Sequence, residues 1–309
     1  MKNALLIALG IFTVCYLVIW LSAIFRGDGH RRRWPGPLDA GIGFFTNFLD
    51  TLGIGSFATT SSLFKLGKLV PDEQIPGTLN VGHTLPTVVE AIIYIAVLGA
   101  VDVDITTLVL MIAASAVGAW LGAGIVSAWP RRKIQIGMGS VMVAAAVIMA
   151  IRQFSLIHEV GTPDLTGTKL IAAVVGNAVL GALMTLGIGL YAPCMILVAL
   201  LGMNPKAAYP IMTGSCAFLM PVGSARFIRT GSYNLKSAIG LTLGGIPGVL
   251  MATYLIKSLP LYAIKWLVVA VLLYTAAMML RSAHKERGTR LAEAHGDLPA
   301  DATAEASGE

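Results

Sequence analysis

The sequence predicts an all-α polytopic membrane protein, and three observations lead to this prediction. Only 12% of the 309 residues are charged and 56% are hydrophobic, whereas a soluble domain has about 25% charged residues. The hydrophobic residues come in blocks of about 20 or more, the length that a helix needs to cross a bilayer. The basic residues stand in short runs between these blocks, such as 31–33 and 131–133. Such runs are typical of topology signals and not of a nucleic-acid-binding face.

The two ends of the chain differ from the rest. Ala4 to Phe25 is too long and apolar for the core of a cleaved signal peptide, and only Lys2 precedes it. We therefore expect residues 1–36 to form an extra N-terminal transmembrane helix and a basic cytoplasmic loop. The polar segment 287–309 is predicted to be a disordered cytoplasmic tail.

The chain repeats itself between these ends. The run Thr51-Leu52-Gly53-Ile54-Gly55 recurs 134 positions later as Thr185-Leu186-Gly187-Ile188-Gly189. Further identities follow at spacings of 134 and 130: Pro71 with Pro205, Pro76 with Pro210, Gly118 with Gly248 and Pro130 with Pro260. This pattern predicts two transmembrane repeats, residues 37–152 and 168–281.

Each repeat opens with an apolar stretch that is too long for one crossing helix. Leu38 to Gly67 would extend over about 45 Å as a straight helix. A glycine pair lies in its middle, and glycine weakens a helix interior. We expect two half-helices, about Leu38 to Thr51 and Ser56 to Leu66, and a similar break within Lys169 to Leu201.

The positive charges predict how these broken stretches lie in the membrane, because they gather in cytoplasmic loops. With Arg26 to Arg33 inside, a re-entrant hairpin followed by three crossing helices also places Lys65, Lys68 and residues 131–133 inside. If the broken stretches crossed the membrane instead, 131–133 would lie outside. We therefore expect each repeat to be a broken, re-entrant helical hairpin plus three transmembrane helices. The odd number of crossings makes the two repeats inverted, with a cytoplasmic C-terminus.

The breaks predict a binding site for a small anion. Half-helices that begin near mid-membrane present free N–H groups and partial positive charge, and irregular backbone at that depth must line a protein or water cavity. The alternative is that the glycines only permit close helix packing. The predicted substrate-binding residues at the two breaks are Gly53, Ile54, Gly55, Ser56, Gly187, Ile188, Gly189 and Leu190.

A polar stripe follows the first break. Its members recur at steps of three and four and so share one helical face: Asn80, His83, Thr87, Glu90 and Tyr94. Ionisable side chains inside a span indicate function, and histidine changes charge near neutral pH. We assign Asn80 to the substrate site and His83 and Glu90 to a proton path. The alternative is a buried polar pair that joins helices.

Asp50 precedes the first break and is the third candidate for ion coupling. It could bind a proton or a cation, or only accept hydrogen bonds from exposed amides. The positions 134 residues after Asp50, His83 and Glu90 hold Met184, Ala217 and Ser224. The ionisable chemistry is therefore expected in the first repeat.

Other functional classes find less support. The three cysteines lie in apolar segments without metal-ligand or CxxC spacing. HExxH, a nucleophile–base arrangement and GxxxxGK[ST] are missing from the sequence, so we expect no catalytic residues, metal or cofactor. Two alternatives remain: a cation transporter that uses Asp50 and Glu90, and a membrane-embedded enzyme that uses these residues with His83.

The chain resembles the sulfite exporter TauE/SafE family over about Leu38 to Leu280. The matching segments are Leu52-Gly53-Ile54-Gly55, Leu186-Gly187-Ile188-Gly189 with Pro193, Pro205-Lys206-Ala207-Ala208, Thr213-Gly214-Ser215 and Gly244 to Gly248. The resemblance implies export of sulfite, a related sulfur oxyanion or an organosulfonate across the bacterial inner membrane, driven by an ion gradient. It adds Thr213 and Ser215 to the substrate site.

The sequence departs from the family pattern at two places. The family's run of three glycines is reduced to Gly55-Ser56 and Gly189-Leu190, and Thr59 stands where the first repeat is expected to have a proline. Both departures lie at the predicted site, so they bear on the choice of substrate.

Overall fold

The structure is a computed structural model of the 309-residue chain. The residues that it describes are 2–26, 34–98, 103–125, 164–184, 189–204 and 207–258, with single positions and short runs between 136 and 162 and between 263 and 284. The elements of these residues are α1 (Lys2–Arg26), α2 (Pro37–Thr51), α3 (Ser56–Gly67), η2 (Asp72–Gln74), α4 (Ile75–Ile93), the π-helical turn η3 (Tyr94–Leu98), α5 (Ile105–Ile125), α7 (Gly167–Met184), α8 (Tyr191–Leu200), α9 (Ala208–Thr230) and α10 (Leu235–Ser258).

Five of the described helices are long and apolar enough to cross a membrane: α1, α4, α7, α9 and α10. Large apolar side chains such as Ile7, Trp120 and Tyr254 are exposed on the outside of the bundle, as lipid contact requires. The prediction of an all-α polytopic membrane protein is confirmed in these terms. The helices α2, α3 and α8 have 15, 12 and 10 residues, or about 15–23 Å each, too short to cross.

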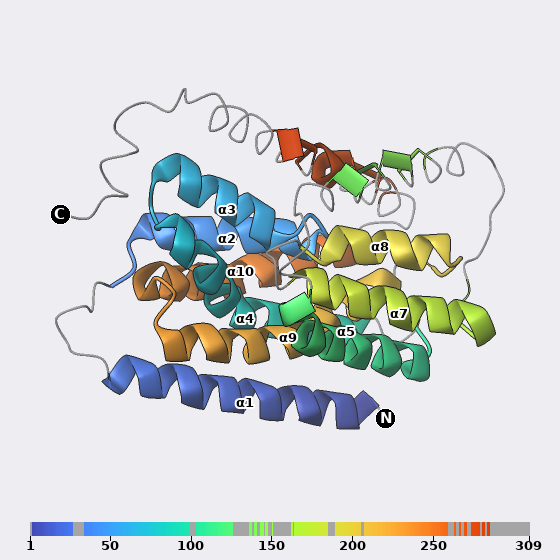
Figure 1. The fold of residues 1–309 in the computed structure, drawn as a ribbon, viewed down its shortest axis with the longest axis horizontal. Helices are drawn as coiled ribbons and strands as arrows, with labels where there is room; N and C mark the ends of the chain where they lie inside the picture. The colour runs from blue at the N-terminus through green and yellow to red at the C-terminus, as the bar shows by residue number, and fades with distance from the viewer. Residues whose placement is uncertain are drawn as a thin grey trace.

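The helices α2 and α3 fold back on each other as a hairpin. Gly53 and Gly55 between them have φ angles of 96° and 88°, a region that glycine enters at little cost. The N–H of Gly53 donates to the carbonyl of Asp50 (2.7 Å), and that of Ile54 to the carbonyl of Leu49 (3.0 Å). These bonds make the reversal tight, so α3 returns to the end of the molecule where α2 begins (Figure 1).

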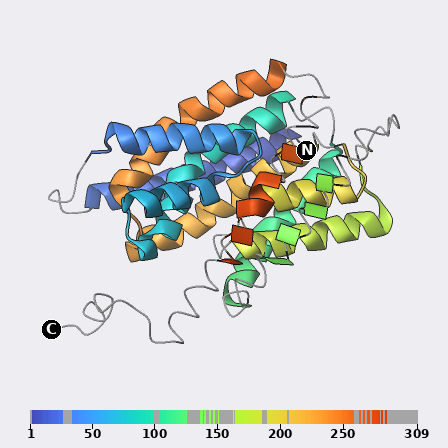
Figure 2. The same cartoon turned by 90° about the horizontal axis from the view of Figure 1, so that it is seen from above.

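The helices α7 and α8 form a second hairpin. The link 185–188 between them lies outside the described residues, and Gly187 and Ile188 with it. At the open end, Thr162 N–H donates to the carbonyl of Gly202 (3.1 Å), and Asn204 N–H to that of Thr162 (3.4 Å). The chain before α7 thus lies beside the chain after α8. Figures 1 and 2 show that the two hairpins open toward opposite ends of the molecule and that α3 and α8 begin near its middle.

The helices α4 and α9 lie antiparallel between the hairpins. Asn80 lies near Gly223 and Thr84 bonds Ser224 (3.1 Å), while Gly214 lies against Ile95 at the other end. The N-terminal helix α1 lies along this pair (Figure 1). Its Tyr16 hydroxyl donates to the carbonyl of Val81 on α4 (2.7 Å), and its Phe12 ring lies 5.3 Å from that of Phe218 on α9.

Two helix pairs approach so closely that only glycine fits between them. Gly248 on α10 lies against the backbone of Phe44 on α2, and Gly118 on α5 lies against the backbone of Ala178 on α7. A Cβ atom at either glycine would overlap a carbonyl group of the partner helix. Each hairpin is therefore held by a helix from the other half of the chain.

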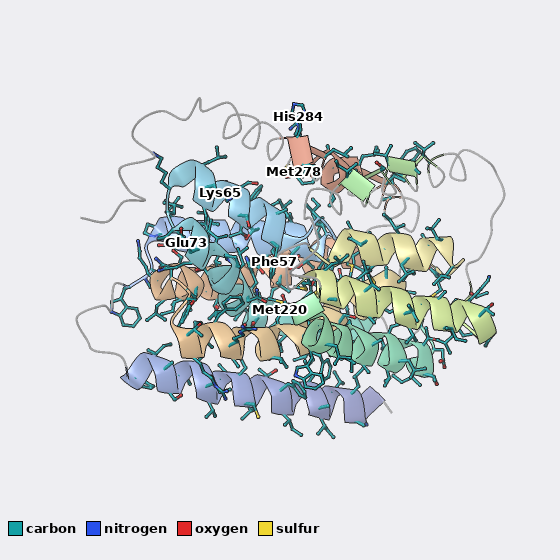
Figure 3. All side chains as sticks on the ribbon, viewed as in Figure 1. Phe57, Lys65, Glu73, Met220, Met278 and His284 are labelled. Atoms are coloured by element: carbon teal, nitrogen blue, oxygen red, sulfur yellow. The ribbon has the colours of Figure 1, made fainter. Side chains whose placement is uncertain are left out.

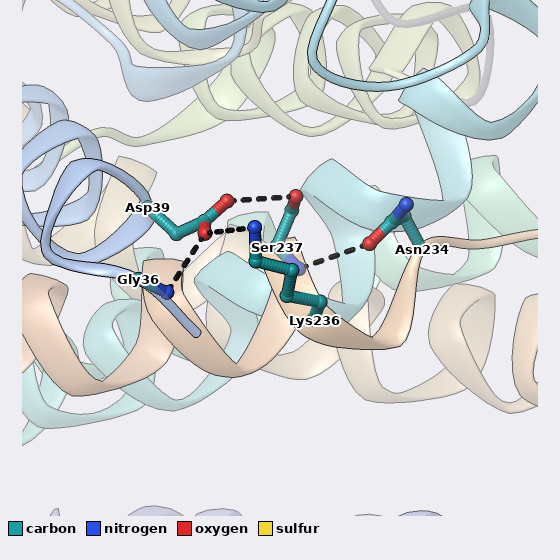
Figure 4. Close-up of polar contacts among 5 residues, drawn as sticks. All are labelled: Gly36, Asp39, Asn234, Lys236 and Ser237. Carbon is teal, nitrogen blue, oxygen red and sulfur yellow. Dashed lines mark hydrogen bonds and ion pairs between the residues drawn. The ribbon is translucent and has the colours of Figure 1, made fainter. Parts of the chain in front are cut away.

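A polar cluster also joins α2 to α10 at their first residues (Figure 4). The Asp39 carboxylate accepts hydrogen bonds from Gly36 N (3.1 Å) and Ser237 Oγ (2.9 Å) and pairs with Lys236 Nζ (3.2 Å). Ser237 N in turn donates to Asn234 Oδ1 (3.1 Å). The cluster satisfies helix-start amides and fixes the two helices in register.

Candidate functional site

A small cavity of about 20 Å³, enough for one water molecule, lies where the two hairpins meet. Figure 3 shows two of its lining residues, Phe57 and Met220, near the middle of the molecule, whereas Lys65 and Glu73 lie closer to one end. We call this cavity the central chamber. Its lining consists of Asp50, Gly55, Ser56, Phe57, Thr87, Met184, Gly189, Leu190, Tyr191, Cys216 and Met220.

The two tips contribute to the chamber from corresponding positions. Four pairs of lining residues are spaced by 134 positions, as the repeated run is: Asp50 with Met184, Gly55 with Gly189, Ser56 with Leu190 and Phe57 with Tyr191. The first tip supplies a carboxyl and a hydroxyl group, and the second supplies a thioether, an alkyl chain and a phenol. The chamber therefore has one polar side and one largely apolar side.

The Asp50 side chain accepts a hydrogen bond at the N-terminus of α3. Its side chain is 3% exposed, and Oδ1 accepts a hydrogen bond from the N–H of Ser56, the first residue of α3 (2.7 Å). A helix start presents unpaired amides and partial positive charge, so a carboxyl group is stabilised there. One of the two interpretations of Asp50, that it accepts bonds from exposed amides, describes this contact.

Glu90 approaches the chamber from α4. It is fully buried, and Oε2 accepts a hydrogen bond from the hydroxyl of Tyr191, a lining residue (3.2 Å). Its other oxygen, Oε1, has no hydrogen-bond partner among the described residues. A buried carboxyl oxygen without a partner costs free energy, which points to a proton, water or ligand that completes the site.

Two tyrosines, Tyr94 and Tyr209, contact the first hairpin tip. Tyr94, where α4 changes to the π-helical turn η3, donates to the carbonyl of Thr51 (3.0 Å). Its ring stacks on that of Tyr209 at 5.0 Å. The Tyr209 hydroxyl has no partner among the described residues and lies near Gly53. A π-helical turn re-aims side chains and is frequent at functional sites.

His83, the other member of the predicted proton path, is hydrogen-bonded through both ring nitrogens, and its role in ion coupling stays a prediction. The structure places it in the interior between α4 and the first hairpin and not in the chamber lining. Nδ1 bonds Asn47 Oδ1 on α2 (3.0 Å), and Nε2 bonds Thr60 Oγ1 on α3 (3.0 Å). The imidazole joins the three helices, as the alternative of a buried polar lock describes.

The remaining sequence-derived candidates are spread more widely. Gly55, Ser56, Gly189 and Leu190 line the chamber, whereas Gly53 and Ile54 do not, and Gly53 lies against Met195 instead. Asn80 donates to its own helix at Pro76 O (2.9 Å), and Thr213 to Tyr209 O (2.8 Å). Ser215 accepts from Asn177 Nδ2 (2.9 Å). The structure does not bring these three side chains to the chamber.

Six lining residues are not among the predicted site residues: Phe57, Thr87, Met184, Tyr191, Cys216 and Met220. Thr87 belongs to the polar stripe, but no role was assigned to it. The repeat spacing contained a signal for Tyr191, because it is the counterpart of Phe57 and both follow the glycine break. Met184 was noted only as the counterpart of Asp50. No group of three or more His, Cys, Asp or Glu in the described part of the chain could hold a metal ion.

Hairpins of short helices that meet at a central cavity, within a bundle that exposes apolar side chains, are typical of secondary transporters. The family model for the sulfite exporter TauE/SafE matches residues 1–149 and 156–304. The chain therefore belongs to the sulfite exporter TauE/SafE family, a family of membrane transporters of sulfite or related anions. No curated protein and no solved structure matches the chain.

Proposed function

We propose that the protein is a secondary transporter that exports sulfite, a related sulfur oxyanion or an organosulfonate across the bacterial inner membrane with proton coupling. The observation that carries this proposal is the chamber between two hairpin tips, where α3 begins and where α8 begins on the opposite side. Helix starts at such a site attract an anion without a basic side chain. The family assignment supports a sulfur-containing anion.

We further propose that the two halves of the chain are inverted repeats. The close approach of Gly248 to Phe44 has a counterpart in that of Gly118 to Ala178. The glycines are 130 positions apart and their partners 134, the two spacings that relate the repeats in the sequence. If a twofold axis relates the two halves, the two glycine contacts are symmetry equivalents of each other. A central site between inverted halves also suits transport by alternating access.

The lining supports a substrate with a charged end and a small apolar part. Gly55 and Ser56 lie where an oxyanion would meet the start of α3, while Met184, Leu190 and Met220 form an apolar wall. A sulfonate with a short carbon group fits this division, and sulfite is the smaller candidate. Asp50 and Glu90 are the proposed coupling residues, and His83 positions α4 against the hairpin.

The charges support a cytoplasmic location for the end where α3 finishes, and with it a cytoplasmic C-terminus. Lys65 and Lys68 are exposed there, as are Arg226 and Arg229 near the end of α9. Asp104 precedes α5 at the opposite end. Basic residues collect on the cytoplasmic side of bacterial membrane proteins.

A flux experiment tests the proposed function. Purified protein in liposomes should carry at least one of labelled sulfite, thiosulfate or sulfoacetate faster than protein-free liposomes, and a pH gradient should change the accumulation. Binding of the same anions in detergent provides an independent measurement. Transport of none of the three anions would refute the proposal.

Cation transport is the second candidate, because two carboxyl groups are buried at the chamber and Glu90 Oε1 is unpartnered among the described residues. The same liposomes decide between the two functions. Flux of a monovalent or divalent cation in the absence of any of the three anions would favour cation transport.

A further inference from the structure

The central chamber has one buried carboxyl group in its lining, Asp50, and a second, Glu90, lies behind the lining residue Tyr191. Among the described side chains, no lysine or arginine faces them. Asp50 and Glu90 are 3% and 0% exposed, and Tyr191 connects them, because it lines the chamber beside Asp50 and bonds Glu90. The lysines and arginines whose side chains the structure describes lie at the surface, and Lys236, 44% exposed, pairs with Asp39 instead. Two bare carboxylates at this depth would be very costly.

The other ionisable groups that face the two carboxyl groups also bring no positive charge. They come from η3, α8 and α9, and they are phenols and thiols, which are neutral when protonated: Tyr94, Tyr191, Tyr209 and Cys216, with Cys194 behind Cys216. His83 on α4 is held by Asn47 and Thr60 instead. Protons on the carboxyl groups themselves are the remaining way to remove charge within the described chamber.

Asp50 also occupies the position that an anion needs. Its Oδ1 holds the N–H of Ser56, the amide at which α3 presents its partial positive charge. An ionised Asp50 would compete with the substrate for this amide and repel it across a medium of low dielectric constant. A protonated Asp50 is uncharged, can yield the amide, and can donate its own hydrogen to an oxyanion.

We propose, building on the proposed anion transport, that Asp50 and Glu90 take up protons together with the anion, so that anion and protons cross the membrane in the same direction. The unpartnered Oε1 of Glu90 is the second proton site, and Tyr191 links it to the chamber. Protons are favoured over a metal cation because the carbonyls of Asp50, Leu49 and Thr51 at the tip already accept hydrogen bonds. Under this scheme the anion concentration in the cell drives export.

The test uses full-length protein in liposomes with a pH indicator inside and the membrane potential clamped to zero by potassium and valinomycin. The probe is whichever of sulfite, thiosulfate and sulfoacetate the wild type carries; if it carries none, the proposed function fails and this inference with it. An inward gradient of one pH unit should concentrate the anion about tenfold for each proton that accompanies it. Addition of the anion outside should acidify the lumen. Alkalinisation, or anion entry without any proton movement, would overturn the inference while leaving anion transport intact.

Two isosteric variants locate the protons. Asp50→Asn keeps an oxygen for the Ser56 amide, and Glu90→Gln keeps one for the Tyr191 hydroxyl. Each should retain exchange of labelled for unlabelled anion but lose accumulation, so that inside and outside concentrations become equal. Glu73→Gln, at an exposed carboxyl group, is the matched control and should accumulate anion as the wild type does. Full gradient-driven accumulation in both Asp50→Asn and Glu90→Gln would exclude the carboxyl pair as the proton site.

Discussion

The two hairpin tips occupy corresponding places and differ in chemistry. The first tip has Asp50, which bonds the opening amide of α3. The second has Met184 at the same place in the repeat, and a thioether cannot take that role. The difference teaches that corresponding positions of the two sequence repeats line the chamber, whereas its carboxyl group comes from the first tip only.

The two tips also differ in the aromatic residue that follows each glycine break. Phe57 follows the first break and Tyr191 follows the second, and both line the chamber. Only the tyrosine has a hydroxyl, which reaches Glu90 on α4 of the first half. The apolar tip thus contributes one polar contact, directed at the carboxyl group of the other half. The hydrogen bond from Tyr191 to Glu90 therefore joins the two halves at the chamber.

The largest expected effect concerns the close contacts that the two halves share. Gly248→Val and Gly118→Val each place a side chain against a backbone carbonyl, and such overpacking costs about 1–3 kcal/mol or more. We expect both variants to lower the midpoint of thermal unfolding in detergent by similar amounts. Gly41→Val, where a Cβ would meet nothing within 4 Å, is the control. A stable Gly118→Val beside an unstable Gly248→Val would show that the halves are not packed alike.

The next effect concerns His83, which has no counterpart in the second half. His83→Ala leaves the buried Asn47 Oδ1 without the imidazole donor and Thr60 without its partner. An unsatisfied buried polar group costs about 1–3 kcal/mol. We expect a clear loss of stability, with His284→Ala, an exposed histidine, as the control. An unchanged melting temperature together with lost coupling would instead return His83 to the proton path.

A smaller effect is expected at the aromatic pair. Tyr191→Phe removes the hydrogen bond to Glu90, which is worth about 0.5–1.5 kcal/mol, and makes the second tip resemble the first. The variant should fold, and its proton-to-anion ratio in liposomes should fall. Phe57→Tyr adds a hydroxyl at the other tip and should leave that ratio unchanged. Equal behaviour of the two variants would mean that the tips are interchangeable.

The smallest effect is expected at the α2–α10 junction. Lys236 is 44% exposed, and an ion pair of this kind contributes about 0–1 kcal/mol and weakens with salt. Lys236→Met should therefore change the unfolding midpoint slightly, and less in high salt. Asp39→Asn should cost more, because Asp39 also serves Gly36 and Ser237. A larger loss in Lys236→Met than in Asp39→Asn would contradict this division.

Much of the local structure follows from the sequence. Block length and low charge predicted membrane helices, and the structure has five that are long and apolar enough. The overlong stretch around Gly53 and Gly55 predicted two half-helices, and α2 and α3 begin and end within one residue of the expected positions. These features depend on neighbours along the chain, so pattern and spacing are sufficient to find them.

Side-chain partners depended on tertiary structure. The stripe on α4 placed His83, Thr87 and Glu90 on one buried face, yet helical spacing could not tell that Thr87 would line the chamber and that Glu90 would meet it only through Tyr191. The neighbouring elements decide these contacts. Asn47 and Thr60 form hydrogen bonds with His83, whereas Tyr191, about 100 positions away in the chain, donates one to Glu90. A sequence determines periodicity and breaks because they are local, while contacts between distant segments exist only after the helices have packed.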